Sequence, residues 1–140
     1  MTITNILGIK INIIIENNKS DTQYTTKTVA YYKLQNGYNI YIREKDDYSI
    51  FDMYIIAREI RIMWQFNKNF EYYFYGYRLK GMTEEEYESH ISNIDADVFA
   101  YLIIKSKYKK EIIRNYKYDS SKIKFDKLVN RAIIKGKYLK

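Results

Sequence analysis

The sequence predicts an α+β fold in which N-terminal antiparallel strands pack on a helical core. Three observations lead to this class. Apolar and polar residues largely alternate between Ile9 and Glu16, which is the period of a half-buried strand. The pair Asn36-Gly37, a strong short-range signal for a hairpin, separates two further strand-like runs. Beyond Ser49, apolar residues recur at helical spacing, so we expect the rest of the chain to be mainly helical.

The strands are expected between about residues 3 and 43. The run 24–34 is rich in Thr, Val and Tyr, which favour extended backbone. The run 38–42 alternates apolar with polar residues and would be the returning strand of the hairpin. If this returning strand had an exposed edge, an extended peptide could pair with it. A purely structural hairpin is the alternative.

Capping patterns mark where the helices begin. Ser49 with Asp52, and Thr83 with Glu86, form capping boxes in which each side chain satisfies an otherwise unpaired backbone N–H group. Residues 67–81 between these helices are aromatic and irregular in pattern. The expected helices cover about 49–66, a stretch opened by Thr83, a stretch opened by Ser92 with Asp95, a stretch near 108–115, and 121 to about 134. We therefore expect a single domain, 1–140, with helices from about 83 to 135.

Composition narrows the functional classes. The chain has no Cys, which excludes disulfides and thiol catalysis and agrees with a reducing cytoplasm. The apolar run 11–15 is much shorter than the roughly 20 residues that a membrane helix needs, so we expect no membrane association. There are 24 basic and 17 acidic residues, a net charge of +7. A basic protein of this kind suits an acidic or nucleic-acid-bearing partner.

The segment Arg58-Glu59-Ile60-Arg61-Ile62-Met63-Trp64-Gln65 carries the most specific pattern. In the zinc-peptidase motif His-Glu-x-x-His, two histidines on one helical face bind Zn²⁺ and the Glu activates water. Here Arg58 and Ile62 stand at the two histidine positions, while Glu59 keeps the position of the catalytic Glu.

This segment, together with a later one, resembles the ImmA/IrrE-like zinc peptidases. In that family the first helix often reads His-Glu-Leu-Arg-His-x-Trp-Gln, and a second begins Glu-x-x-Ala-Asn/Asp-x-Phe-Ala, with its Glu as third metal ligand. The matching run here is Asn93-Ile94-Asp95-Ala96-Asp97-Val98-Phe99-Ala100, with Asn93 at the ligand position. The similarity covers roughly residues 28–105 and implies a helical zincin-like core. Two ordinary amphipathic helices would give similar apolar spacing, and that reading stays open.

The resemblance implies that the metal site has been lost. Arg offers no lone pair, Ile has no donor, and a catalytic zinc site needs three protein ligands. We therefore expect no catalytic residue, no cofactor and no metal, with Arg58, Glu59, Ile62 and Asn93 as a vestigial motif. Arg58 would pair in bidentate fashion with Glu59 or Asp97 where the metal once lay, and Ile62 would fill the adjacent space. His90, the single His, is expected to be a surface residue.

Two groups of residues are candidates for binding a partner. Tyr is common where interfaces need large, rigid, amphipathic side chains, and basic residues speed association with acidic partners. The candidates are Tyr72, Tyr73, Tyr75 and Tyr77 in the aromatic segment, and Lys109, Lys110 and Lys117 in the basic segment 105–140.

The function expected from these features is that of a non-catalytic binding or inhibitor protein. Its small size, its Tyr-rich composition and the coding bias of an AT-rich genome resemble phage or mobile-element proteins that block host defence, anti-CRISPR proteins among them. The expected partner is a protein or nucleoprotein complex of the host. One alternative is a DNA- or RNA-binding regulator that uses the basic C-terminal third. A second alternative is a residual hydrolase that depends on Glu59.

Overall fold

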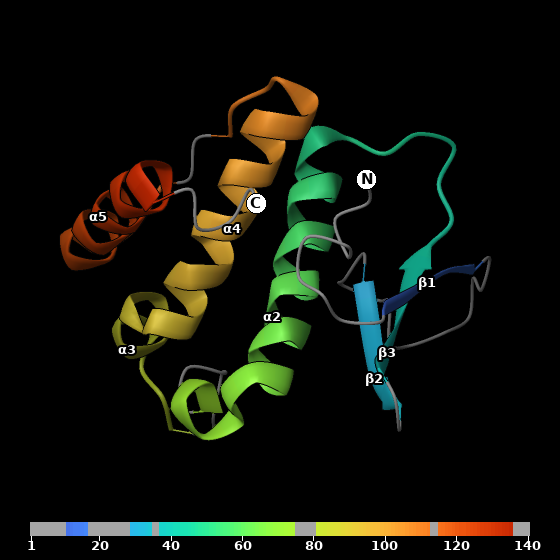
Figure 1. The fold of residues 1–140 in the computed structure, drawn as a ribbon, viewed down its shortest axis with the longest axis horizontal. Coiled ribbons are helices and arrows are strands. Elements are labelled where there is room, and N and C mark those ends of the chain that lie inside the picture. The colour runs from blue at the N-terminus through green and yellow to red at the C-terminus, as the bar shows by residue number, and fades with distance from the viewer. Residues whose placement is uncertain (1–10, 17–28, 35–36, 75–80, 113–114, 136–140) are drawn as a thin grey trace.

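The protein has a small sheet on one side and a set of helices on the other. The computed structural model describes residues 11–16, 29–34, 37–74, 81–112 and 115–135. Its elements are β1 (Ile11–Glu16), β2 (Val29–Leu34), β3 (Gly37–Arg43), α2 (Ile50–Phe74), α3 (Glu84–Ser89), α4 (Ile91–Tyr108) and α5 (Asp119–Lys135). Helix α2 stands between the sheet and α4, and α5 lies on the far side of α4 (Figure 1). The fold is therefore α+β with a helical core.

The sheet has the order β1-β3-β2, so β3 is the central strand. β2 pairs with β3 antiparallel, with Tyr31 opposite Ile40, whereas β1 pairs with β3 parallel, with Ile13 opposite Ile40. The prediction of antiparallel strands was wrong for β1. If the chain reverses between successive strands, the first and third run the same way, so a third strand that pairs with the first is parallel to it. The predicted turn at Asn36 lies outside the described residues.

The central place of β3 bears on the two interpretations of the returning strand. An exposed edge would have made it a candidate for pairing with an extended peptide, and a purely structural hairpin was the alternative. Both edges of β3 are already paired, one with β1 and the other with β2. Because its backbone groups are taken up by these neighbours, β3 cannot add a further strand.

Helix α2 begins as predicted but ends later. The amide of Asp52 donates to Ser49 Oγ at 3.0 Å, and the amide of Ser49 donates to Asp52 Oδ2 at 3.0 Å, which is the predicted capping box. Residues 67–74 were expected to be irregular, but the helix continues to Phe74 with one break at Asn69 (φ −159°, ψ 84°). No Gly or Pro lies between Ser49 and Phe74, so nothing in this run forces the helix to stop.

The next two helices follow closely. Thr83 caps α3 by accepting from the amide of Glu86 at 3.1 Å, as predicted. The N-cap of α4 is His90 and not Ser92, because His90 Nδ1 accepts from the amide of Ser92 at 3.2 Å. Ser92, expected as the N-cap, is the second residue of the helix, and both Ser92 and Asp95 are buried.

The end of α4 is also different from the prediction. Lys109 takes a left-handed conformation (φ 55°) and ends the helix. Residues 109–112 are not helical, so the predicted helix near 108–115 is wrong over those residues. The last helix, α5, starts at Asp119 and agrees with the prediction of a helix over 121–134.

Two apolar clusters hold the layers together, and α2 contributes to both. On the sheet side the buried residues are Ile40, Ile42, Ile56, Ile60 and Met63. On the helix side Tyr54 and Ala57 of α2 pack with apolar residues of α4 and with Ala132 of α5. Helix α4 is buried on most of its surface because α2 and α5 cover opposite sides of it. Among the described residues, no helix combines the length and the apolar character that crossing a bilayer requires.

Candidate functional site

Two residues of the motif, Arg58 and Asn93, lie at the buried contact between α2 and α4. Arg58 Nε donates to Asp97 Oδ1 at 2.5 Å, and Arg58 Nη2 donates to Asn93 Oδ1. The Asp97 side chain is fully buried, and only 11% of the Arg58 side chain is exposed. The structure thus brings together Arg58 and Asn93, which the sequence placed at two ligand positions of the resembled motif.

Asp97 accepts hydrogen bonds from several residues around it. Its Oδ1 also accepts from the hydroxyl of Tyr54 at 2.8 Å, and its Oδ2 accepts from the hydroxyl of Tyr116 at 3.1 Å. Burial by itself would lower the pKa of Arg58, but Asp97, and to a smaller extent Tyr54, outweigh it and the pKa is raised above its ordinary value. The guanidinium therefore stays charged, and the Arg58–Asp97 contact is an ion pair at neutral pH.

The predicted pairing of Arg58 is thus correct in its partner Asp97 but not in its form. The guanidinium donates one hydrogen bond to Asp97 and one to Asn93, and not two parallel hydrogen bonds to a single carboxylate. The side chain of Asn93 is itself held, because its Nδ2 donates to the backbone oxygen of Glu88 at 3.3 Å. The Asn93 amide thus links the C-terminal end of α3 to the Arg58 guanidinium.

A second buried ion pair, one helical turn away, was not anticipated from the sequence. Arg61 contacts Asp95 through Nε at 2.7 Å and Nη2 at 3.1 Å, which is the bidentate geometry. Gln65 Nε2 donates to Asp95 Oδ2 at 2.9 Å and to the backbone oxygen of Ser92 at 2.8 Å. The Arg61 guanidinium also lies 3.6 Å from the centre of the Trp64 ring.

These residues form what we call the polar seam: Arg58, Arg61 and Gln65 of α2 with Asn93, Asp95 and Asp97 of α4. A sequence signal for the second pair did exist. Arg58 and Arg61 are three residues apart on one helix, and Asp95 and Asp97 lie within an otherwise apolar run on another. Because Asp95 was interpreted as a capping residue, its pairing with Arg61 was not predicted.

The other motif residues, Ile62 and Glu59, have separate surroundings. Ile62 is partly buried and packs against the sheet-side cluster. Glu59 is half-buried, and its carboxylate adds a minor contribution to the raised pKa of Arg58. Within the described ranges, no group of three or more His, Cys, Asp or Glu side chains could hold a metal ion.

Tyr73 and Lys109, one from each group of candidate partner residues, lie apart. Tyr73 is half-buried and packs edge-on against Trp64, with ring centres 6.2 Å apart. The C-terminal end of α2, which carries Tyr73, and that of α4, which precedes Lys109, lie at opposite ends of the helix pair (Figure 1). Lys109, Lys110 and Lys117 are all exposed. The side chain of Tyr72, and all of Tyr75 and Tyr77, lie outside the described residues.

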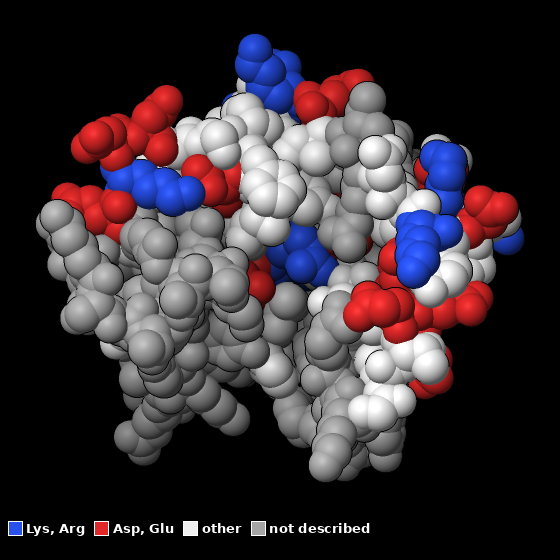
Figure 2. Space-filling view, turned by 180° about the vertical axis from the view of Figure 1, so that it is seen from behind, with Lys and Arg blue, Asp and Glu red and all other residues white. Residues whose placement is uncertain are grey.

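Charge on the surface is mixed. Figure 2 shows the face opposite to that of Figure 1, where the described Lys and Arg side chains lie among Asp and Glu side chains. Although the net charge is +7, the described basic side chains therefore do not form one continuous positive patch on this face. His90 is partly exposed at the start of α4, where it is the N-cap. Burial, followed by the charge of Lys124, lowers its pKa.

Comparison with known proteins adds no relative: no family model, no curated protein and no solved structure matches this chain.

Proposed function

We propose that this chain is a non-catalytic binding protein built on a degenerate metallopeptidase-like scaffold. Its metal centre is replaced by the polar seam, and it works through protein–protein contact without a cofactor. The single observation that supports this most is the hydrogen bond between Arg58 and Asn93 across α2 and α4. In the resembled peptidases, the residues at these two positions bind the same metal ion.

The chemistry of the side chains argues against hydrolysis. A zinc hydrolase needs three donors and an open coordination position for water. Arg58 supplies a permanent positive charge at a ligand position, and this charge repels a divalent cation. Its guanidinium is committed to Asp97 and Asn93, so the space in which water would be activated is taken up by an ion pair.

The retained Glu59 is the basis of the residual-hydrolase alternative, and one substitution separates the two ideas. Glu59→Gln removes a general base and keeps the shape of the side chain. A binding protein should keep its target affinity and its biological effect after this change. Peptide or ester hydrolysis that disappears in Glu59→Gln but persists in the surface variant Glu85→Gln would contradict the proposal.

The class of target follows from composition and from the resemblance to anti-defence proteins of phages and mobile elements. A cysteine-free protein with a net charge of +7 suits a cytoplasmic partner with an acidic or nucleic-acid-laden surface. A host defence complex that handles nucleic acid has such a surface. We therefore propose inhibition of such a complex by direct contact, as anti-CRISPR proteins do.

The partner can be tested by purification from a host cell that carries the relevant defence system. The tagged protein should retain a nucleoprotein complex in constant proportion and reduce its activity in a reconstituted assay. Tyr73→Ala should speed dissociation if the aromatic segment contacts the target, whereas Tyr48→Ala serves as a half-buried Tyr control on the sheet side. Retention of no complex, with no loss of defence activity, would contradict the proposal.

The DNA- or RNA-binding alternative has a different signature. Contacts to phosphate release counterions, so affinity falls steeply as salt rises. A gel-shift series with duplex DNA and single-stranded RNA across salt concentrations separates this case. Under our proposal, free nucleic acid binds this chain weakly and competes poorly with the protein target.

A further inference from the structure

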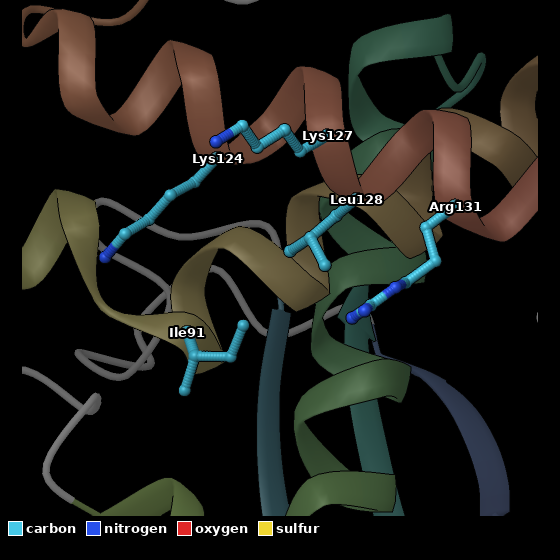
Figure 3. A pocket seen from close by; sticks show the side chains of 5 residues that line it. All are labelled: Ile91, Lys124, Lys127, Leu128 and Arg131. Carbon is cyan, nitrogen blue, oxygen red and sulfur yellow. The ribbon is translucent and has the colours of Figure 1, made fainter.

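Helix α5 carries a pocket that the polar seam does not use. It has a volume of about 370 Å³ and is lined by Ile91, Lys124, Lys127, Leu128 and Arg131. This volume lies at the lower end of the range of ligand-binding pockets. In Figure 3, Lys124 and Arg131 extend from α5 on either side of Leu128 towards the start of α4, where Ile91 lies. The pocket therefore has an apolar floor between two cations.

The basic side chains share one flank of α5 because of their spacing. Lys124, Lys127 and Arg131 are separated by three and four residues, so they lie on adjacent turns of the same side of the helix. With a rise of 1.5 Å per residue, they cover roughly 10 Å along the axis. Acidic groups about one to two helical turns apart would match them.

Little opposes this positive charge nearby. Lys124 Nζ donates to the backbone oxygen of Ser89 at 2.8 Å, which holds the ammonium group at the pocket edge and leaves two of its three protons for other acceptors. Asp126 pairs at 3.6 Å with Lys122, away from the pocket. Among the described residues, no salt bridge joins Lys127 or Arg131 to a carboxylate.

Apolar surface continues beyond the pocket along α5. Ile123 is 53% exposed and Ile134 is 83% exposed. Eleven residues separate them, so helical geometry puts them on one side, next to the basic flank. An ordinary solvated helix would carry polar residues here. A small anion would need only the pocket, whereas an extended strip of apolar and basic residues fits a macromolecule.

We infer that this flank of α5 binds an acidic segment of a partner protein. A large apolar side chain of that segment fills the space between Ile91 and Leu128, and carboxylates on either side of it contact Lys124, Lys127 and Arg131. A nucleic acid is less well suited, because the pocket floor offers hydrocarbon and no groups that read base edges. This inference deepens the proposed function by naming the chemistry of the contact, and it rests on that function.

The test uses a displayed library of random 12-residue peptides selected against the full chain, followed by fluorescence anisotropy on the enriched sequences. We expect enrichment of peptides with Leu, Phe or Trp flanked by Asp or Glu within four residues. Lys127→Glu should weaken their binding about tenfold or more, since it reverses one of the contacting charges. Lys68→Glu makes the same charge change on exposed α2 surface and should alter affinity less than about twofold. Ile91→Ala, checked for an unchanged fold by circular dichroism, should weaken binding several-fold.

Four results would overturn the inference. The enriched peptides could lack acidic residues, or bind Lys127→Glu as tightly as the unchanged protein. The selection could also enrich no peptide. A thymidine 12-mer could bind in place of the peptides and lose affinity in Lys127→Glu, which would make nucleic acid the occupant. If a purified host complex binds Lys127→Glu normally, the inference fails while the proposed function stands. If acidic peptides bind but no host complex is retained, the proposed function fails while the acidic-peptide site on α5 stands.

Discussion

Replacing Arg58 with Ala should destabilise the fold far more than a surface substitution. The change leaves the fully buried Asp97 carboxylate without its guanidinium partner, and leaves Asn93 Oδ1 without the same donor. Removing one member of a buried ion pair costs about 3–5 kcal/mol, because the remaining charge stays buried. Asp97 still accepts from the hydroxyls of Tyr54 and Tyr116, so we expect about 3 kcal/mol, the lower end of that range.

The assay is equilibrium unfolding in urea, followed by the fluorescence of Trp64 and by circular dichroism. With an m value of about 2 kcal/mol/M, a loss of about 3 kcal/mol lowers the midpoint by about 1.5 M. The control is Lys122→Ala, whose side chain is 67% exposed and which should change stability by less than about 0.5 kcal/mol. Equal effects of the two substitutions would refute the assignment of Arg58 to a buried pair.

A double-mutant cycle separates the pair itself from general disruption. Asp97→Asn keeps the shape of the side chain and removes its charge, so the double variant has no buried carboxylate that has lost its guanidinium partner. The double variant should therefore be more stable than the sum of the two single losses predicts, by at least about 1 kcal/mol. Additive losses would mean that Arg58 and Asp97 do not stabilise each other.

Three further predictions address other parts of the molecule. Ser49→Ala removes the hydroxyl that caps α2 and should cost about 1 kcal/mol in urea unfolding, whereas Ser49→Gly should cost only a few tenths. The folded pKa of His90 is lowered below its ordinary value of 6.5, so the folded state resists protonation and stability should fall as pH drops through and below about 6.5. His90→Asn, which can still cap α4, should lose less stability between pH 7.5 and pH 5.5, and an unchanged pH profile would contradict this. Charge reversal at Lys109, Lys110 and Lys117 should slow association with the partner and flatten its salt dependence in stopped-flow measurements, and an unaltered rate would remove these residues from the encounter surface.

Local patterns in the sequence predicted local structure well. The capping box at Ser49 and the N-cap at Thr83 form because each depends only on residues three apart in the chain. The α5 helix also follows from its own spacing of apolar residues. The place of β1 could not be read this way, because pairing with the third strand instead of the second is decided by the packing of the whole sheet.

The candidate site shows the same limit. The motif predicted that Arg58 would pair with Glu59 or Asp97, and the contact with Asp97 is present. The Arg61–Asp95 pair was missed because Asp95, at a capping-box distance from Ser92, has an equally good local explanation. The flank of α5 around Arg131 was missed for a different reason: the pocket there needs Ile91 of another helix, which no spacing within α5 reveals.

The central claim is that an ion-paired seam has replaced a metal centre, and the metal content of the purified protein tests it most directly. Elemental analysis should find far less than one zinc per chain, because Arg58, Ile62 and Asn93 cannot form a three-donor site. Arg58→His, Ile62→His and Asn93→Glu introduced together should raise zinc affinity without restoring hydrolysis, since the residues that orient such ligands are absent. Near-equimolar zinc in the unaltered protein, retained after mild chelation, would contradict the account.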